Sequence, residues 1–151
     1  MKKFSFKFET VLRVKEKKEE ELKRELMRLQ ALKIEQEHLH ERIDRERNQV
    51  HAEKGREKEA GIDIMRLVYY ETYLNNLRKK IHATEMKIKE FGKMADDKRD
   101  EVIQASKEKK IFEKLKEKHF NEFKKTIISN EQKQLDEVAI NKYNRNEQNI
   151  F

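Results

Sequence analysis

Histidines and carboxylates are the side chains of this sequence that could bind a metal ion or transfer protons. The 151 residues include 5 histidines and 30 Asp or Glu residues but no cysteine. No His-Glu-x-x-His pair is present, and His38 and His40, two positions apart, would point to different sides of a helix. Gly55 and Gly61 are separated by charged residues and no Gly-Lys-Ser/Thr follows, so a phosphate-binding loop is absent. We therefore expect no catalytic residue, no metal ion, no cofactor and no enzymatic activity.

The composition indicates helices as the elements that position these side chains. Charged residues make up 44% of the chain and apolar residues 35%, with no proline and only 3 glycines. Abundant Glu, Lys, Leu, Arg and Gln are typical of long helices and coiled coils. The N-terminus has no apolar run of signal-peptide length and no segment is apolar enough to span a membrane. These features predict a soluble, cytoplasmic, all-α protein.

A seven-residue repeat of apolar positions runs along two separate parts of the chain. Such a repeat predicts helices that pack along one seam. In the first part, the repeat is interrupted by the polar residues Lys15 and Gln36. The first row is Phe8, Lys15, Leu22, Leu29, Gln36, Ile43 and Val50; the second part has Leu67, Leu74, Ile81, Ile88, Ala95 and Val102, with Tyr70, Leu77, Thr84, Phe91, Lys98, Ala105 and Phe112 beside them.

The segment between the two repeats predicts a tight turn. Gly61 can adopt the left-handed conformation that ends a helix, and Asp63 can cap the next helix. A connection this short makes the helices antiparallel. We expect one domain, a long two-helix antiparallel coiled-coil hairpin, with helix one at about 7–60, the turn at about 61–63, a longer helix two at about 64–140, and a frayed C-terminal tail. Facing residues should have numbers that add up to about 124, because both helices rise equally per residue.

Helix two carries more apolar side chains near the turn than a hairpin can bury. Met65, Tyr69 and Tyr73 form a row more than a quarter turn away from the seam. The opposing part of helix one, Glu46 to Ala60, offers only Val50 and two alanines. The row could pack against the turn or against a second copy of the chain. We favour a docking surface, because exposed apolar patches often mark binding sites and tyrosine is enriched in hot spots.

The far part of helix two has a similar excess. Phe123, Ile127, Leu135 and Val138 have no helix-one residue opposite them in the expected register. An isolated helix of this size is marginally stable in water. We therefore expect this part either to bend back or to be enclosed by a partner.

The net charge of +7 does not by itself predict a nucleic-acid site. Basic and acidic residues alternate in nearly every helical turn, whereas nucleic-acid binding favours a clustered basic stripe. We expect no nucleic-acid partner. A structural homo-oligomeric module and a basic coiled coil that binds nucleic acid or anionic membranes are the alternative functions.

Three motifs, in order along the chain, resemble those of the flagellar export protein FliJ family. They are FKFETVLRVKEKKEEEL at the start, GIDIMRLVYYETYLNNLRKKI in the middle, and KKIFEKLKEKHFNEFKK followed by EQKQLDEVA at the end. The resemblance implies a non-catalytic component of the flagellar type III export apparatus. It also implies a hairpin similar to the coiled coil of the gamma subunit in rotary ATP synthases.

The resemblance implies partners as well. The end with both termini would bind the hexameric export ATPase, and the turn end would bind the cytoplasmic domain of the membrane export gate. Members of the family also associate with export chaperones. The protein would then be cytoplasmic and peripherally associated with the membrane through these partners.

Matching positions give two sets of candidate binding residues. Four residues of the gate set, Leu39, Ile43, Val50 and Leu77, also fall on the predicted seam, where core packing explains them better than binding does. Tyr69 joins this set because of its position on the surface. The gate set is Leu39, Ile43, Val50, Tyr69, Tyr73 and Leu77; the ATPase set is Phe8, Leu12, Phe123, Gln132, Leu135, Asp136 and Glu137.

Overall fold

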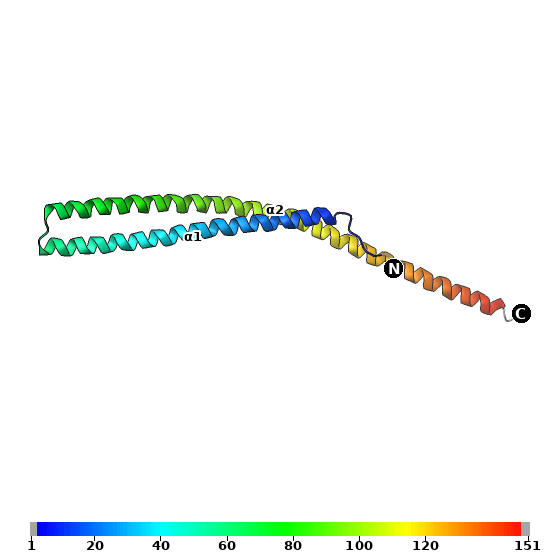
Figure 1. Cartoon of the computed structure of the whole chain (residues 1–151). Coiled ribbons are helices and arrows are strands. Elements are labelled where there is room, and N and C mark those ends of the chain that lie inside the picture. The colour runs from blue at the N-terminus through cyan, green and yellow to red at the C-terminus, as the bar shows by residue number, and fades with distance from the viewer. Residues whose placement is uncertain (1–2, 149–151) are drawn as a thin grey trace. The chain divides into compact units, whose positions relative to one another are not determined.

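The computed structural model describes residues 3–148, with side chains described to Arg145. This range consists of two helices, α1 (Glu9–Ala60) and α2 (Ile64–Gln148), and contains no strand (Figure 1). The expectation of an all-α, antiparallel two-helix fold with a longer second helix is confirmed. Helix α2 continues past the expected end near residue 140, and the last residues of the expected tail, 149–151, lie outside the described range.

The chain forms two compact units, which we describe separately. The turn unit comprises Glu19–Gln104, and the terminal unit comprises the residues up to Lys18 together with those from Ala105 onward. Each unit therefore contains a part of α1 and a part of α2.

The turn between the helices has the local geometry that its residues predict. Gly61 has a φ of 92°, in the left-handed region that a side chain disfavours. Its amide donates to the carbonyl of Lys58 at 3.4 Å. The Leu67 amide donates to the carbonyl of Asp63 at 3.0 Å, which is the first backbone hydrogen bond of α2. Asp63 thus occupies the expected N-cap position.

The turn unit is held together by a narrow apolar seam between α1 and α2. Ile43, Leu74, Leu77 and Ile81 form its buried cluster, and the side chains of Leu74 and Leu77 are almost fully inaccessible to solvent. The predicted register holds within one residue for three polar side-chain pairs across the seam. These pairs are Lys54 with Glu71, His40 with Glu85, and Lys98 with Glu25.

The terminal unit contains an aromatic cluster near the N-terminus. Phe4 lies before α1, and its ring centroid is 5.1 Å from that of Phe120 and 5.5 Å from that of Phe123. Phe6 is buried and packs edge-on against His119. Although Phe123 has no partner in helix α1 itself, the segment before this helix covers part of it. Phe123 therefore packs against the segment that precedes α1, and not against a residue of the helix itself.

Cross-helix ion pairs accompany this cluster in the terminal unit. Lys15 pairs with Glu108 at 2.6 Å, and Lys116 pairs with Glu9 at 2.8 Å. Lys15 interrupts the apolar repeat of the sequence, and its partner on α2 compensates for this polar position. Because both pairs are partly exposed, each adds only modestly to stability.

Candidate interaction surfaces

Four residues of the gate set lie in the seam of the turn unit. Ile43 and Leu77 are buried, and Leu39 and Val50 are partly buried against the same cluster. Their side chains already contact the opposing helix. Core packing therefore accounts for these four positions, and their binding to the export gate stays a prediction.

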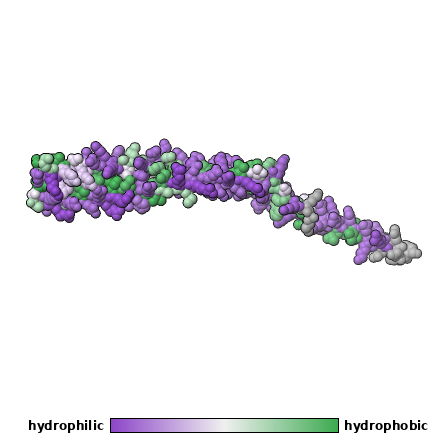
Figure 2. Space-filling model, viewed as in Figure 1, coloured by the Kyte–Doolittle hydropathy of each residue, from purple (hydrophilic) through white to green (hydrophobic). Residues whose placement is uncertain are grey.

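The surface next to the turn is apolar and exposed. We call Ile64, Met65, Val68 and Tyr69 the turn patch, which lies on the first two turns of α2. Met65 is 72% exposed and Tyr69 is 64% exposed. Hydrophobic side chains are visible on this part of the surface in Figure 2. The sequence predicted that helix two carries exposed apolar side chains near the turn, and the turn patch is this surface.

Tyr73 does not belong to the freely exposed row in which the sequence places it. Its side chain is partly buried against the seam, and its hydroxyl donates a hydrogen bond to Glu46 on α1. This bond raises the pKa of Tyr73 above its ordinary value. The ring of Tyr69 stacks on that of Tyr73, with centroids 6.3 Å apart and an interplanar angle of 8°. The Tyr73 ring therefore packs against the Tyr69 ring, and Tyr69 is the more exposed of the two.

A three-residue polar cluster, missed by the sequence analysis, fixes the start of α2. Arg66 donates to Glu57 from two nitrogens, at 2.5 and 2.7 Å, and the Tyr70 hydroxyl donates to the same carboxylate at 2.8 Å. The hydrogen bond from Arg66, followed by that from Tyr70, lowers the pKa of Glu57 to about 2. The expected register could have revealed the cluster, because it places residues 57 and 66 opposite each other. These hydrogen bonds connect the start of α2, which carries the turn patch, to the end of α1.

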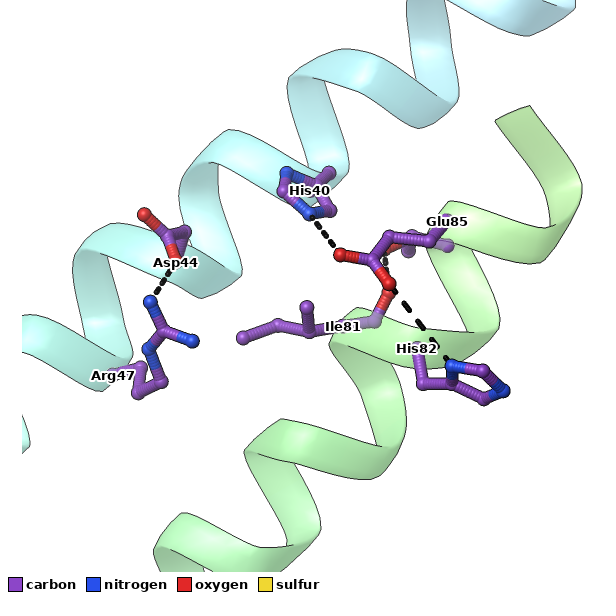
Figure 3. Close-up of polar contacts among 7 residues, drawn as sticks. His40, Asp44, Arg47, Ile81, His82 and Glu85 are labelled. Atoms are coloured by element: carbon purple, nitrogen blue, oxygen red, sulfur yellow. Dashed lines mark hydrogen bonds and ion pairs between the residues drawn. The ribbon is translucent and has the colours of Figure 1, made fainter. Parts of the chain in front are cut away.

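One edge of the turn unit is closed by polar contacts between the helices. His40 Nε2 lies 3.4 Å from Glu85 Oε1, and His82 Nδ1 lies 4.0 Å from the other oxygen of the same carboxylate (Figure 3). Ile81 points from α2 toward α1 in the same view. Asp44 and Arg47 pair within α1 beside this contact. Polar contacts between and within the helices therefore line this edge.

The ATPase set divides into packed and exposed residues. Leu12 is buried, and Phe8 and Phe123 are partly buried in the aromatic cluster of the terminal unit. The other members lie on α2 beyond that cluster with exposed side chains; they are Gln132, Leu135, Asp136 and Glu137. Contact with an ATPase stays a prediction for the whole set.

The C-terminal part of α2 carries large apolar side chains that are exposed. We call the following residues the terminal face: Ile128, Leu135, Val138 and Tyr143. Each of them is at least 62% exposed. The packing of the terminal unit therefore does not bury these side chains.

The described part of the chain offers neither a metal site nor a membrane-spanning helix. Among residues 3–148, no group of three or more His, Asp or Glu side chains is placed to hold a metal ion. Neither helix, over the same range, contains an apolar stretch long enough to cross a membrane. The candidate functional surfaces are thus the turn patch and the terminal face.

One protein family matches nearly the whole length of the chain. The family model described as Flagellar FliJ protein matches residues 4–148. Neither the curated proteins nor the solved structures that were compared include a match. Because the family match covers nearly the entire chain, the protein belongs to the FliJ family of non-catalytic components associated with flagellar protein export.

Proposed function

We propose that this protein links two parts of the flagellar type III export apparatus and stimulates the export ATPase. The terminal unit binds the hexameric export ATPase, and the turn unit binds the cytoplasmic domain of the membrane export gate. The protein has no catalytic role of its own. It is cytoplasmic and is held at the membrane only through these partners, and it also associates with export chaperones.

One observation carries this proposal: each unit exposes large apolar side chains that its own packing does not use. The turn patch includes Tyr69, and the terminal face includes Leu135 and Tyr143. Exposed apolar side chains grouped in this way are typical of protein–protein interaction sites. The FliJ family is associated with the flagellar export apparatus, where a protein that links two partners needs two such surfaces.

The size of the turn patch is sufficient for a specific contact. Burying three apolar or aromatic side chains contributes about 5 kcal/mol before the costs of association are subtracted. Tyr69 suits the centre of such a contact, because tyrosine buries a large area and loses little side-chain entropy. The stacking of Tyr69 on Tyr73 fixes the ring in advance and reduces the entropic cost further.

Binding of paired variants to both partners tests the proposal. Met65→Ala/Tyr69→Ala should lose binding to the gate domain and keep binding to the ATPase. Leu135→Ala/Val138→Ala should show the opposite pattern and should also abolish stimulation of ATP hydrolysis by the ATPase.

A matched control is available on α2 of the turn unit. Met86 is 54% exposed and Met94 is 44% exposed, so Met86→Ala/Met94→Ala removes apolar surface of the same kind outside the turn patch. This variant should bind both partners normally. Equal loss in the control and the turn-patch variant would contradict the proposal, as would normal binding of all variants.

The alternative functions predict different results for the purified protein. A homo-oligomeric module would bury the turn patch against a second copy, so light scattering would give a mass that is a multiple of the monomer. Binding to nucleic acid or to anionic vesicles would weaken steeply with added salt. A monomeric mass would exclude the first alternative, and binding that does not change with salt would exclude the second.

A further inference from the structure

The edge of the turn unit opposite the polar contacts of His40 and Glu85 is an open groove. It lies between α1 and α2 and has a volume of about 570 Å³. The floor is apolar, formed by Leu39, Ile43 and Ala83 with the buried Thr84. The Thr84 hydroxyl donates to the carbonyl of Ile81 at 2.7 Å, so it offers no unsatisfied donor. The groove is lined by Gln36, Leu39, Arg42, Ile43, Glu46, Lys80, Ala83, Thr84 and Lys87.

The charges around the groove do not balance. Arg42, Lys80 and Lys87 line it, and none of the three forms an ion pair with any side chain in the described range. Glu46 is the one acidic residue of the lining, and it already accepts the hydrogen bond from Tyr73. Three cations therefore face solvent beside an apolar floor. The polar edge differs, because Glu85 lies between His40 and His82 and Glu71 pairs with Lys54.

We propose that this groove binds an acidic amphipathic helix of a partner protein. Apolar side chains of that helix would cover Leu39, Ile43 and Ala83, as in a three-helix packing. Its carboxylates would pair with the cations on the rim. Lys80 and Lys87 are seven residues apart, about 10.5 Å along α2, so carboxylates seven residues apart on a parallel or antiparallel helix would meet both.

Charge and shape favour this occupant over two others. A second copy of this chain carries a net charge of +7 and would bring further cations to a basic groove. Nucleic acid would satisfy the cations but would leave the apolar floor without a complementary surface. An acidic amphipathic helix satisfies both features.

The inference deepens the proposed function, because Leu39 and Ile43 of the gate set line the groove. It specifies the chemistry of the bound segment, whereas the proposed function specifies which proteins are linked. The two can fail separately. Loss of gate binding in the turn-patch variant would not depend on the groove, and a helix could bind the groove without belonging to the gate.

A designed peptide of about four helical turns tests the groove directly in the full-length protein. It carries Leu at i, i+3, i+4 and i+7 and Glu on both flanks, with a fluorescent label for anisotropy titrations. A second peptide replaces every Glu by Lys, and a third replaces every Leu by Ser. The first peptide should bind saturably, and the other two should bind at least about tenfold more weakly.

Charge-reversal variants assign the binding to the groove. Lys80→Glu/Lys87→Glu should weaken the acidic peptide about tenfold or more and should improve binding of the Lys peptide. Lys79→Glu/Lys89→Glu makes the same change in net charge at exposed lysines of α2 that do not line the groove. This control should lower the affinity less than about threefold. Helix content by circular dichroism should be the same for both variants.

Several outcomes would overturn the inference. They are the absence of saturable binding by the acidic peptide, equal weakening in both charge-reversal variants, and equal binding of the Glu and Lys peptides. A labelled single-stranded oligonucleotide serves as the competing ligand. If it binds more tightly than the peptide and loses affinity only in Lys80→Glu/Lys87→Glu, the groove is a nucleic-acid site and the inference is wrong.

Discussion

Replacing Leu77 by alanine separates the two roles that its position allows, core packing and contact with a partner. Leu77 is 2% exposed and packs with Ile43, Leu74 and Ile81. Replacing Leu by Ala removes three buried carbons, the methine and its two methyl groups, which loses about 2.4 kcal/mol of transfer free energy, and the remaining cavity adds to this. Because two helices can partly close over the cavity, we expect the free energy of unfolding to fall by about 3 kcal/mol, near the lower end of the range for such substitutions.

Thermal unfolding followed by circular dichroism at 222 nm measures this loss. For a chain of this size, about 3 kcal/mol corresponds to a decrease in Tm of roughly 6–12 °C. Urea titration should give a lower midpoint with an unchanged slope, because the surface exposed on unfolding is nearly the same.

The matched variant is Tyr69→Ala, which removes a larger side chain that is 64% exposed. Its free energy of unfolding should change by no more than about 0.5 kcal/mol. A Leu77→Ala protein that unfolds within about 2 °C of the unmodified protein would refute the packing argument. Equal destabilisation by Tyr69→Ala would refute the distinction between the seam and the turn patch.

Three further predictions concern the turn, a helix interior and pH. Gly61→Ala should lower the free energy of unfolding by about 1 kcal/mol, because a side chain at a φ of 92° is strained; urea titration measures this, and no loss would contradict the role of the left-handed conformation. Gly92→Ala should raise the free energy of unfolding by about 1 kcal/mol, since the added methyl group meets only the end of the Lys33 side chain, with Cε at an ordinary 3.8 Å; a decrease would show that the helices cannot accommodate it. The pKa of Glu57, lowered from 4.5 to about 2, stabilises the fold above pH 4.5, and this contribution is lost as the pH falls toward 2. Glu57→Gln should therefore flatten the dependence of Tm on pH between 4.5 and 2, and an unchanged pH profile would rule out the contribution of its hydrogen bonds to Arg66 and Tyr70.

The turn and the seam follow from local patterns that a sequence displays directly. Gly61 and Asp63 indicate the turn through backbone conformation and capping. Once the turn is placed, equal rise along both helices fixes which residues face each other. His40 with Glu85 and Lys54 with Glu71 agree with that register within one residue. Both pairs follow from the position of the turn and the equal rise of the two helices alone, which is why the pattern sufficed.

The positions of Tyr73 and Phe4 required information beyond helical periodicity. Angular position alone puts Tyr73 away from the seam, but a long side chain can lean across an edge when a carboxylate such as Glu46 accepts its hydroxyl. Phe4 and Phe6 precede α1, so a register based on helices has no place for them. The alternation of Phe4, Phe6 and Phe8 with polar residues was a usable signal, because it is typical of an extended segment with one apolar side.

Exposure of the turn patch is a consequence of pairing only two helices. Each helix of a pair can bury one stripe, and on α2 that stripe is occupied by Tyr70, Leu74 and Leu77. Met65 and Tyr69 lie outside it, so a polar residue at either position would cost the fold little. Folding stability therefore does not explain why these side chains are large and apolar. If Tyr69→Ser unfolds like the unmodified protein and binds the gate domain much less, the side chain serves binding; if it unfolds at a clearly lower temperature, the turn patch belongs to the core after all.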